Sequence, residues 1–316
     1  MKLLAIAGLL ACALRTEATP IVALTFSPDG VQLISNGPRC LVVRSPVTGA
    51  EESRIACDLP KIAAIVFRGS HVALAGGTPK ERGTVWLMNW ESKEVFARWN
   101  GLDDLATSIA FNHDGTRIAV GSADETARVL EVGENGAMRE SFAMRGHAAS
   151  VLGIAFLPQG SALVTTSVDR SIKVWSGKDG RLIRTFSQHT DAIHAIAVRP
   201  TAPGVPVTVA TVSDDRTLRI WQPEIGRMVR IVRGFDAAPF AVVYARDGKS
   251  LFTAGRDGVI RRVDAESDAI LEQWEAHEDA ILSLAVSPDG STLASGDWSG
   301  KVKLWKVKEL ASSTAR

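Results

Sequence analysis

Short apolar runs separated by turn-forming residues recur along the chain, and residues 146–175 show the arrangement most clearly. The runs VLGIAF, ALVTT and IKVW are separated by the turns PQG (158–160) and SVDR (167–170), and RLIRTFS (181–187) follows a third turn. β-Branched and aromatic residues at this spacing are typical of strands in a half-buried sheet. The pattern therefore predicts a four-stranded antiparallel meander. One such sheet cannot bury both of its faces, so it requires neighbours.

Two positions of this unit recur at a nearly constant spacing. The first column is spaced by 44, 42, 45, 46, 42 and 42 residues and consists of Arg44, Met88, Leu130, Trp175, Trp221, Val263 and Trp305. The second column lies in the turn of the first hairpin and begins at Pro28, His113, Pro158, Arg246 and Pro288. A period of forty-odd residues with four strands per unit is typical of a propeller. The sequence therefore predicts an all-β fold, a seven-bladed β-propeller of four-stranded antiparallel blades.

The most regular repeats also carry a family resemblance. Gly146-His147, Asp169 in a tight turn and Trp175 six residues later resemble a WD repeat, and residues 188–233 repeat the pattern. Over about residues 19–310 the chain resembles the WD-repeat (WD40-type) family of seven-bladed propellers. This predicts one ring at 19–310 and a tail at 311–316. The predicted blades lie at 19–57, 58–100, 101–145, 146–188, 189–233, 234–275 and 276–310.

The N-terminal residues 1–18 have two interpretations. The stretch LLAIAGLLACAL (3–14) is uncharged, follows Lys2 and is too short to span a bilayer. It can be a secretory signal, which predicts an exported, periplasmic protein. The resemblance implies the alternative, a cytoplasmic protein in which residues 9–15 form the closing outer strand of the last blade. The other predicted outer strands carry polar or charged residues that guard their edges, so the sequence favours the signal.

Histidine, hydroxyl, carboxylate and tryptophan side chains recur together in two blades. The resemblance implies that they form buried hydrogen-bond chains with a structural role. The two sets are His147, Thr165, Asp169 and Trp175, and His189, Thr211, Asp215 and Trp221. The last blade keeps His277, Ser295 and Trp305 but has Ser299 where the carboxylate is expected.

Glycine- and proline-rich stretches at 76–83 and 200–206 predict two inserted loops. In the first blade, a hairpin folded about Thr48-Gly49 places Cys40 opposite Cys57, within reach of a disulfide. A shift of one residue places the two thiols on opposite faces instead. Two unrelated buried thiols are the alternative.

Charge and motifs exclude several functions. The 36 basic and 35 acidic residues are mixed along the chain, so no basic surface for nucleic acid is expected. The stretch HTDAIH (189–194) has its first histidine in a structural position, and no metalloprotease, haem or phosphate-loop pattern occurs. We therefore expect no metal, no cofactor, no membrane span and a monomer.

The turns between the second and third strands of each blade supply the candidate partner site. In the family these turns lie on the top face, around the central channel. Our candidate residues in this column are Glu81, Asp214, Arg256 and Trp298. Exposed Trp and Arg side chains are typical anchors of interfaces. The sequence thus favours a non-enzymatic scaffold that binds a protein or peptide on the top face. The alternative is an exported propeller enzyme, a lyase or hydrolase acting at the channel mouth.

Overall fold

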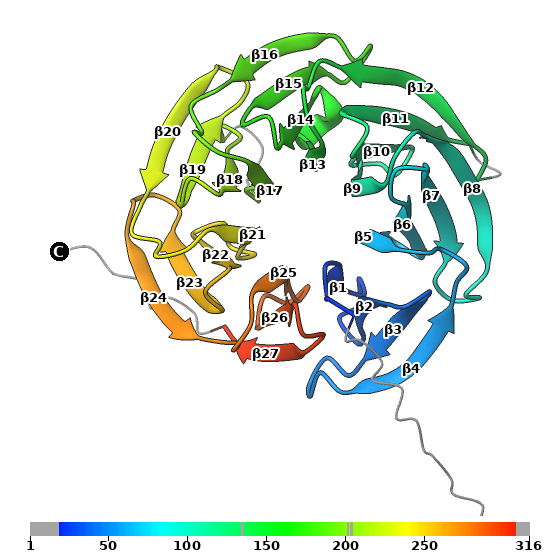
Figure 1. Cartoon of the computed structure of the whole chain (residues 1–316), viewed down its shortest axis with the longest axis horizontal. Helices are drawn as coiled ribbons and strands as arrows, with labels where there is room; N and C mark the ends of the chain where they lie inside the picture. The colour runs from blue at the N-terminus through cyan, green and yellow to red at the C-terminus, as the bar shows by residue number, and fades with distance from the viewer. Residues whose placement is uncertain (1–18, 134–135, 201, 203–204, 308–316) are drawn as a thin grey trace, which may run out of the picture.

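Seven antiparallel sheets stand side by side around a central axis, in the order of the chain (Figure 1). The computed structural model describes residues 19–133, 136–200, 202 and 205–307. The regular elements of the described chain are strands, apart from one turn of 3-10 helix, η1 (Pro158–Gly160). No helix in this part of the chain is long and apolar enough to cross a membrane. The predicted all-β seven-bladed propeller is confirmed.

Each blade runs outward from the axis, with its first strand innermost. Blade one contains β1 (Leu24–Phe26), β2 (Leu33–Gly37), β3 (Cys40–Arg44) and β4 (Glu51–Ala56). Blade two contains β5 (Ile62–Arg68), β6 (His71–Thr78), β7 (Arg82–Asn89) and β8 (Val95–Leu102). Blade three contains β9 (Ala106–Phe111), β10 (Arg117–Ser122), β11 (Thr126–Val132) and β12 (Met138–Arg145). Blade four contains β13 (Val151–Phe156), β14 (Ala162–Ser167), β15 (Ile172–Ser176) and β16 (Leu182–Phe186).

The remaining blades follow the same order. Blade five contains β17 (Ile193–Val198), β18 (Val209–Ser213), β19 (Thr217–Gln222) and β20 (Arg227–Val232). Blade six contains β21 (Pro239–Tyr244), β22 (Ser250–Gly255), β23 (Val259–Asp264) and β24 (Ile270–Glu275). Blade seven contains β25 (Ile281–Val286), β26 (Thr292–Asp297) and β27 (Val302–Lys306), so it has three strands among the described residues. The segments predicted to close it or to form a tail, 9–15 and 311–316, lie outside the described residues, as does the predicted signal at 1–18.

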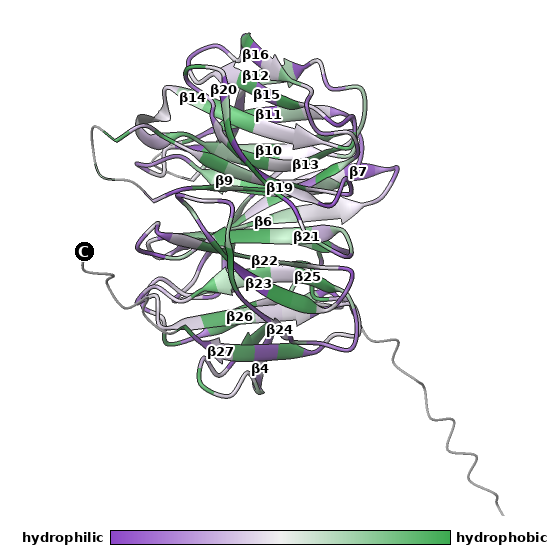
Figure 2. Cartoon of the chain, turned by 90° about the vertical axis from the view of Figure 1, so that its left-hand side faces the viewer, coloured by the Kyte–Doolittle hydropathy of each residue, from purple (hydrophilic) through white to green (hydrophobic). Residues whose placement is uncertain are grey.

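Apolar side chains between neighbouring sheets hold the ring together. Seven hydrophobic clusters lie one in each gap between blades, including the gap between blades seven and one. Trp175 lies in the cluster between blades three and four, and Trp221 lies in the next cluster. The apolar colour follows the strands, and hydrophilic residues gather in the turns of the two faces (Figure 2). Each sheet therefore covers the apolar flank of the next.

Blades one and seven are neighbours in the ring (Figure 1), and a hydrophobic cluster fills the gap between them. The Ile21 amide donates to the Asp297 carbonyl at 3.0 Å, and the Ser283 hydroxyl donates to the Ile21 carbonyl at 2.6 Å. A Cβ atom at Gly296 would lie 2.4 Å from Ile21 Cγ2. Glycine at this position therefore permits the two blades to approach.

The prediction of a loop at residues 76–83 is wrong, because most of this stretch extends a hairpin. Gly76, Gly77 and Thr78 of β6 pair with residues 82–84 of β7, and only residues 79–81 form the turn. A Cβ at Gly76 would lie 1.9 Å from the Lys61 carbonyl oxygen. The glycines thus serve close backbone contact within a strand, a role that glycine also has in sheets. At residues 200–206, the described positions lie between β17 and β18, outside any strand.

The proposed disulfide is also not formed, and Cys40 and Cys57 are buried free thiols. The turn between β3 and β4 is centred earlier than predicted, since Ser45 N–H donates to the Ala50 carbonyl. A bulge at Glu52 then shifts the register, and Cys40 lies opposite Ala56. Successive side chains of a strand point to opposite faces of the sheet. Because the register is shifted by one residue, the Cys40 and Cys57 side chains point to opposite faces and their sulfur atoms do not meet.

Candidate functional site

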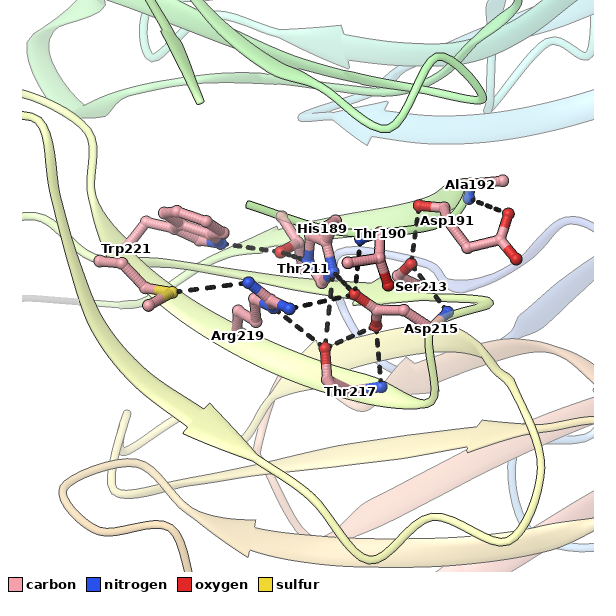
Figure 3. A network of polar contacts seen from close by, with 11 residues as sticks. His189, Thr190, Asp191, Ala192, Thr211, Ser213, Asp215, Thr217, Arg219 and Trp221 are labelled. Carbon is pink, nitrogen blue, oxygen red and sulfur yellow. Dashed lines mark hydrogen bonds and ion pairs between the residues drawn. The ribbon is translucent and has the colours of Figure 1, made fainter. Parts of the chain in front are cut away.

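The predicted polar set of blade five forms one connected chain of hydrogen bonds (Figure 3). His189 Nδ1 lies 2.7 Å from the Asp215 carboxylate, and His189 Nε2 lies 2.9 Å from the Thr211 hydroxyl. Trp221 Nε1–H donates to the same hydroxyl at 2.8 Å. The Thr190 amide, the Thr217 hydroxyl and the Arg219 guanidinium also contact the carboxylate. The chain links the loop before β17 to β18 and β19.

Burial favours a neutral His189, and this decides which atom donates in each hydrogen bond of the chain. It lowers the pKa of His189, although the hydrogen bond and charge of Asp215 partly offset that effect. A neutral imidazole that donates from Nδ1 to Asp215 accepts from the Thr211 hydroxyl at Nε2. Thr211 in turn accepts from Trp221. Every polar atom of the chain is therefore satisfied with His189 neutral.

Blade four has the same arrangement with nearly the same distances. His147 contacts Asp169 at 2.8 Å and Thr165 at 2.7 Å, and Trp175 donates to Thr165 at 2.8 Å. Burial lowers the pKa of His147 as well. Burial alone would raise the pKa of Asp169, but hydrogen bonds from Ser171, the Ala148 amide and His147 outweigh it and bring that pKa to about 2. Asp169 is therefore ionised at neutral pH.

Blade seven contains a third set, which the sequence analysis missed. Asp297, rather than the expected position 299, lies 2.7 Å from His277 Nδ1. His277 Nε2 lies 2.8 Å from the Ser295 hydroxyl, which accepts from Trp305 Nε1–H at 2.9 Å. Ser299 donates to the same carboxylate at 2.9 Å. The acid is thus supplied from two residues earlier in the chain, at the end of β26.

These three sets are enclosed by the sheets, and none of their residues lines the axial channel. The central hydroxyls of Thr165, Thr211 and Ser295 are on residues with no exposed surface. Among the described residues, no group of three or more His, Cys, Asp or Glu side chains is placed to hold a metal ion. A functional surface must therefore be sought elsewhere, and the ring offers one at its axis.

Six of the seven inner strands aim one extra residue toward the axis. In each of these six a β-bulge interrupts the pairing with the second strand, near the end at which the strand begins. The bulged residues are Ala63, Thr107, Leu152, His194, Phe240 and Leu282. Bulges re-aim side chains and are frequent beside functional sites. All six of these residues are half-buried and line the axial channel.

The channel is a cavity of about 640 Å³ with walls of low polarity. A second ring of apolar residues lies two positions after the six bulges and includes Leu24 of β1; it is formed by Leu24, Ile65, Ile109, Ile154, Ile196, Val242 and Leu284. Lys61 is the only lysine, arginine or carboxylate among the lining residues. A concave apolar site with a few polar groups at its edge is the usual form of a binding site.

Three of the four predicted partner-binding residues lie around one end of this channel. Trp298 lines the channel and is 58% exposed. The Arg256 guanidinium stacks over Phe240 at 5.7 Å, and the Asp214 carboxylate lies 3.0 Å from His194 Nε2. Each of the three occupies the turn between the second and third strands of its blade, on the face that we call the top face.

The fourth predicted residue, Glu81, is not part of this group. It lies in the turn of the extended hairpin between β6 and β7 and is exposed, but it does not line the channel. His194 and Phe240 were not predicted, although both belong to a repeated signal. The segments IVAL (21–24), IHAI (193–196), PFAV (239–242) and ILSL (281–284) place a variable residue second in an otherwise small or apolar motif. That second position faces the channel mouth.

Comparison with known proteins agrees with the geometry. A sequence model of the WD domain, G-beta repeat, matches residues 100–130, 139–176, 180–222 and 269–306. THO complex subunit 3 of Arabidopsis thaliana is 26% identical over 232 residues, which cover 73% of this chain and 70% of that protein. Human striatin-4 is 26% identical over 271 residues, covering 78% of this chain and 36% of that protein.

A third relative is pre-mRNA-processing factor 19 of Oryza sativa subsp. japonica, which is 26% identical over 173 residues. That match covers 53% of this chain and 32% of the relative, so the chain spans only about a third of this protein and of striatin-4. Four matched repeats, seven blades in a closed ring and the polar sets of blades four, five and seven agree with one another. The chain belongs to the WD-repeat family of β-propellers.

Proposed function

We propose that this protein is a non-enzymatic scaffold that binds a protein partner through the top face, at the mouth of the axial channel. The observation that carries the proposal is Trp298. It is the only exposed one of the eight tryptophans, all of which lie in the described chain. Trp and Arg are enriched among the residues that dominate binding energy at interfaces. Trp298 and Arg256 stand on the same rim, beside an apolar hollow.

The rigid ring suits this role. Its sheets are fixed by seven packed gaps, and the turns at their ends can vary without disturbing the core. The histidines of blades four, five and seven are neutral members of closed hydrogen-bond chains, which supports binding rather than catalysis. At the channel mouth, the described residues provide one histidine with one carboxylate partner, His194 and Asp214.

Relatives named for multi-subunit assemblies support the partner class. One is a subunit of the THO complex, and another is a component of COMPASS in Saccharomyces cerevisiae. The net charge of +1 does not favour nucleic acid, and we propose a monomer that recruits a protein or peptide. Pre-mRNA processing, which one relative is named for, occurs inside cells. This favours the cytoplasmic alternative over export, in which residues 9–15 add the closing strand to the last blade of the ring at 19–310.

Affinity capture with a tagged full chain tests the proposal. Proteins bound to the unchanged chain are compared with those bound to a Trp298→Ala, Arg256→Ala double variant and to a Val47→Ala control. Val47 is 83% exposed and lies in the turn between β3 and β4, on the opposite face. We expect at least one partner to be lost with the top-face variant and retained with the control. Equal capture by all three proteins would refute the top-face site.

A further inference from the structure

A second hollow lies beside the axial channel, on the other side of Trp298. It has a volume of about 330 Å³ and lies at the top of blades one and two. Pro20, Pro38 and Pro60 give it rigid apolar walls, and Ile62 lies at its base. Val22, Lys61 and Trp298 line both this hollow and the channel. The top face therefore has two neighbouring concave sites that share one exposed tryptophan and one lysine.

The chemistry of the two hollows selects their occupants. Neither lining contains a carboxylate. A cationic side chain inserted into either hollow would lose its hydration without gaining an opposite charge, which is strongly unfavourable. An apolar side chain pays no such cost, and its burial is favourable by about 25 cal/mol for each Å² of apolar surface removed from water.

Lys61, the one charged residue that lines both hollows, favours a ligand group of the opposite sign. Lys61 is exposed and no carboxylate of the described residues lies within ion-pair distance of it. The same holds for Arg256, whose guanidinium is held against Phe240. Asp214, an acid of our candidate group, lies 3.0 Å from His194 Nε2. Lys61 and Arg256 are therefore available to a ligand.

We propose that the partner docks as an extended acidic segment whose two apolar side chains enter the channel and the neighbouring hollow, on either side of Trp298. This inference rests on the proposed function and specifies its partner. Alternate residues of an extended chain point the same way, so apolar residues two positions apart can enter the two hollows together. A carboxylate beside them contacts Lys61, and a second one contacts Arg256. Trp298 packs between the two anchors.

Selection from a random heptapeptide library, displayed on phage and applied to the full chain, tests the proposal. We expect the enriched sequences to share two apolar residues two positions apart with Asp or Glu beside them. The strongest peptide is then synthesised and its dissociation constant measured by calorimetry. Ala63→Trp fills the channel mouth, and Lys61→Glu reverses the shared charge. Each substitution should weaken binding at least tenfold.

Matched controls place the same substitutions on the opposite face. Val47→Trp and Lys178→Glu change exposed residues in turns there and should leave the dissociation constant within twofold. Circular dichroism and the Tm of each variant establish that it is folded.

The outcomes separate the two proposals. Peptides that need Trp298 but carry Arg or Lys anchors, or that bind Ala63→Trp equally well, overturn the acidic two-anchor segment and leave the top-face site standing. Peptides that are unaffected by Trp298→Ala overturn both. A small apolar molecule that co-purifies with the unchanged chain and is lost from Ala63→Trp, detected by native mass spectrometry, also overturns the inference, because the channel would then hold a free ligand.

Discussion

Thr165→Val tests the physical role of the buried hydrogen-bond chains. The substitution keeps the shape of the side chain but removes the hydroxyl that accepts from Trp175 and donates to His147. Both partners are buried, and Trp175 is 1% exposed. Each buried polar group left without a partner costs about 1–3 kcal/mol. We therefore expect the free energy of unfolding to fall by about 3 kcal/mol.

The adjacent residue of the same strand is a matched control. Thr166 is also fully buried, but its hydroxyl has no hydrogen-bond partner among the described residues. Thr166→Val removes a polar group that is already unsatisfied, so it should be neutral or slightly stabilising, within about 1 kcal/mol. The two variants thus differ only in whether the lost hydroxyl belonged to a network.

Thermal unfolding followed by circular dichroism measures the difference. The unfolding entropy of a chain of this size is roughly 0.6 kcal/mol/K, so a loss of about 3 kcal/mol lowers Tm by about 5 °C. Urea unfolding with an unchanged slope checks that the folded and unfolded states are otherwise alike. If Thr165→Val and Thr166→Val shift Tm equally, the chain contributes no more than any buried hydroxyl and our account of the sets is wrong.

Three further predictions follow from the same geometry. Burial lowers the pKa values of His147, His189 and His277, so as the pH falls through about 6.5 the unfolded chain binds protons more readily than the folded chain. Tm should therefore be constant from about pH 7 to 8 and fall below pH 6.5, with a further loss below about pH 4, where Asp169 binds a proton more readily in the unfolded chain than in the folded one; a Tm that rises at pH 5 contradicts this. In blade seven, Asp297→Ala should cost about 3 kcal/mol of stability and Ser299→Ala less than about 1 kcal/mol, because Asp297 holds His277; equal losses in urea unfolding would show that the acid was misassigned. Burial raises the pKa values of the Cys40 and Cys57 thiols, so iodoacetamide should alkylate both only after unfolding, and without prior reduction. Peptide mass mapping tests this, and a pair of peptides linked through Cys40 and Cys57 would show that the disulfide forms after all.

The fold was predictable because packing between blades favours a large apolar residue at the same point of the repeat, which six of the seven repeats have. Trp175 and Trp221 mark that point clearly, and the positions of Leu130 and Val263 follow from the period. The polar sets of blades four and five were likewise predicted from the motif, because their members keep a fixed spacing. The number and order of the sheets follow from such local signals.

The features that were missed depend on pairing between strands. The bulge at Glu52, which separates Cys40 from Cys57, arises from the pairing of β3 with β4. The sequence of either strand alone does not indicate it. Asp297 reaches His277 from an unexpected position because a side chain two residues earlier can point into the same gap. His194 and Phe240 became recognisable only when the bulges showed that the second position of each inner strand faces the axis.

The contact between Ser283 and Ile21 joins residues that are 262 positions apart in the chain. Chains whose native contacts are distant in sequence pay a large loop-closure cost and fold slowly. During synthesis, the flank of blade one that packs against blade seven stays exposed until the last blade has left the ribosome. We expect this apolar flank, which includes Ile21 and Leu33, to be where the nascent protein needs protection from aggregation.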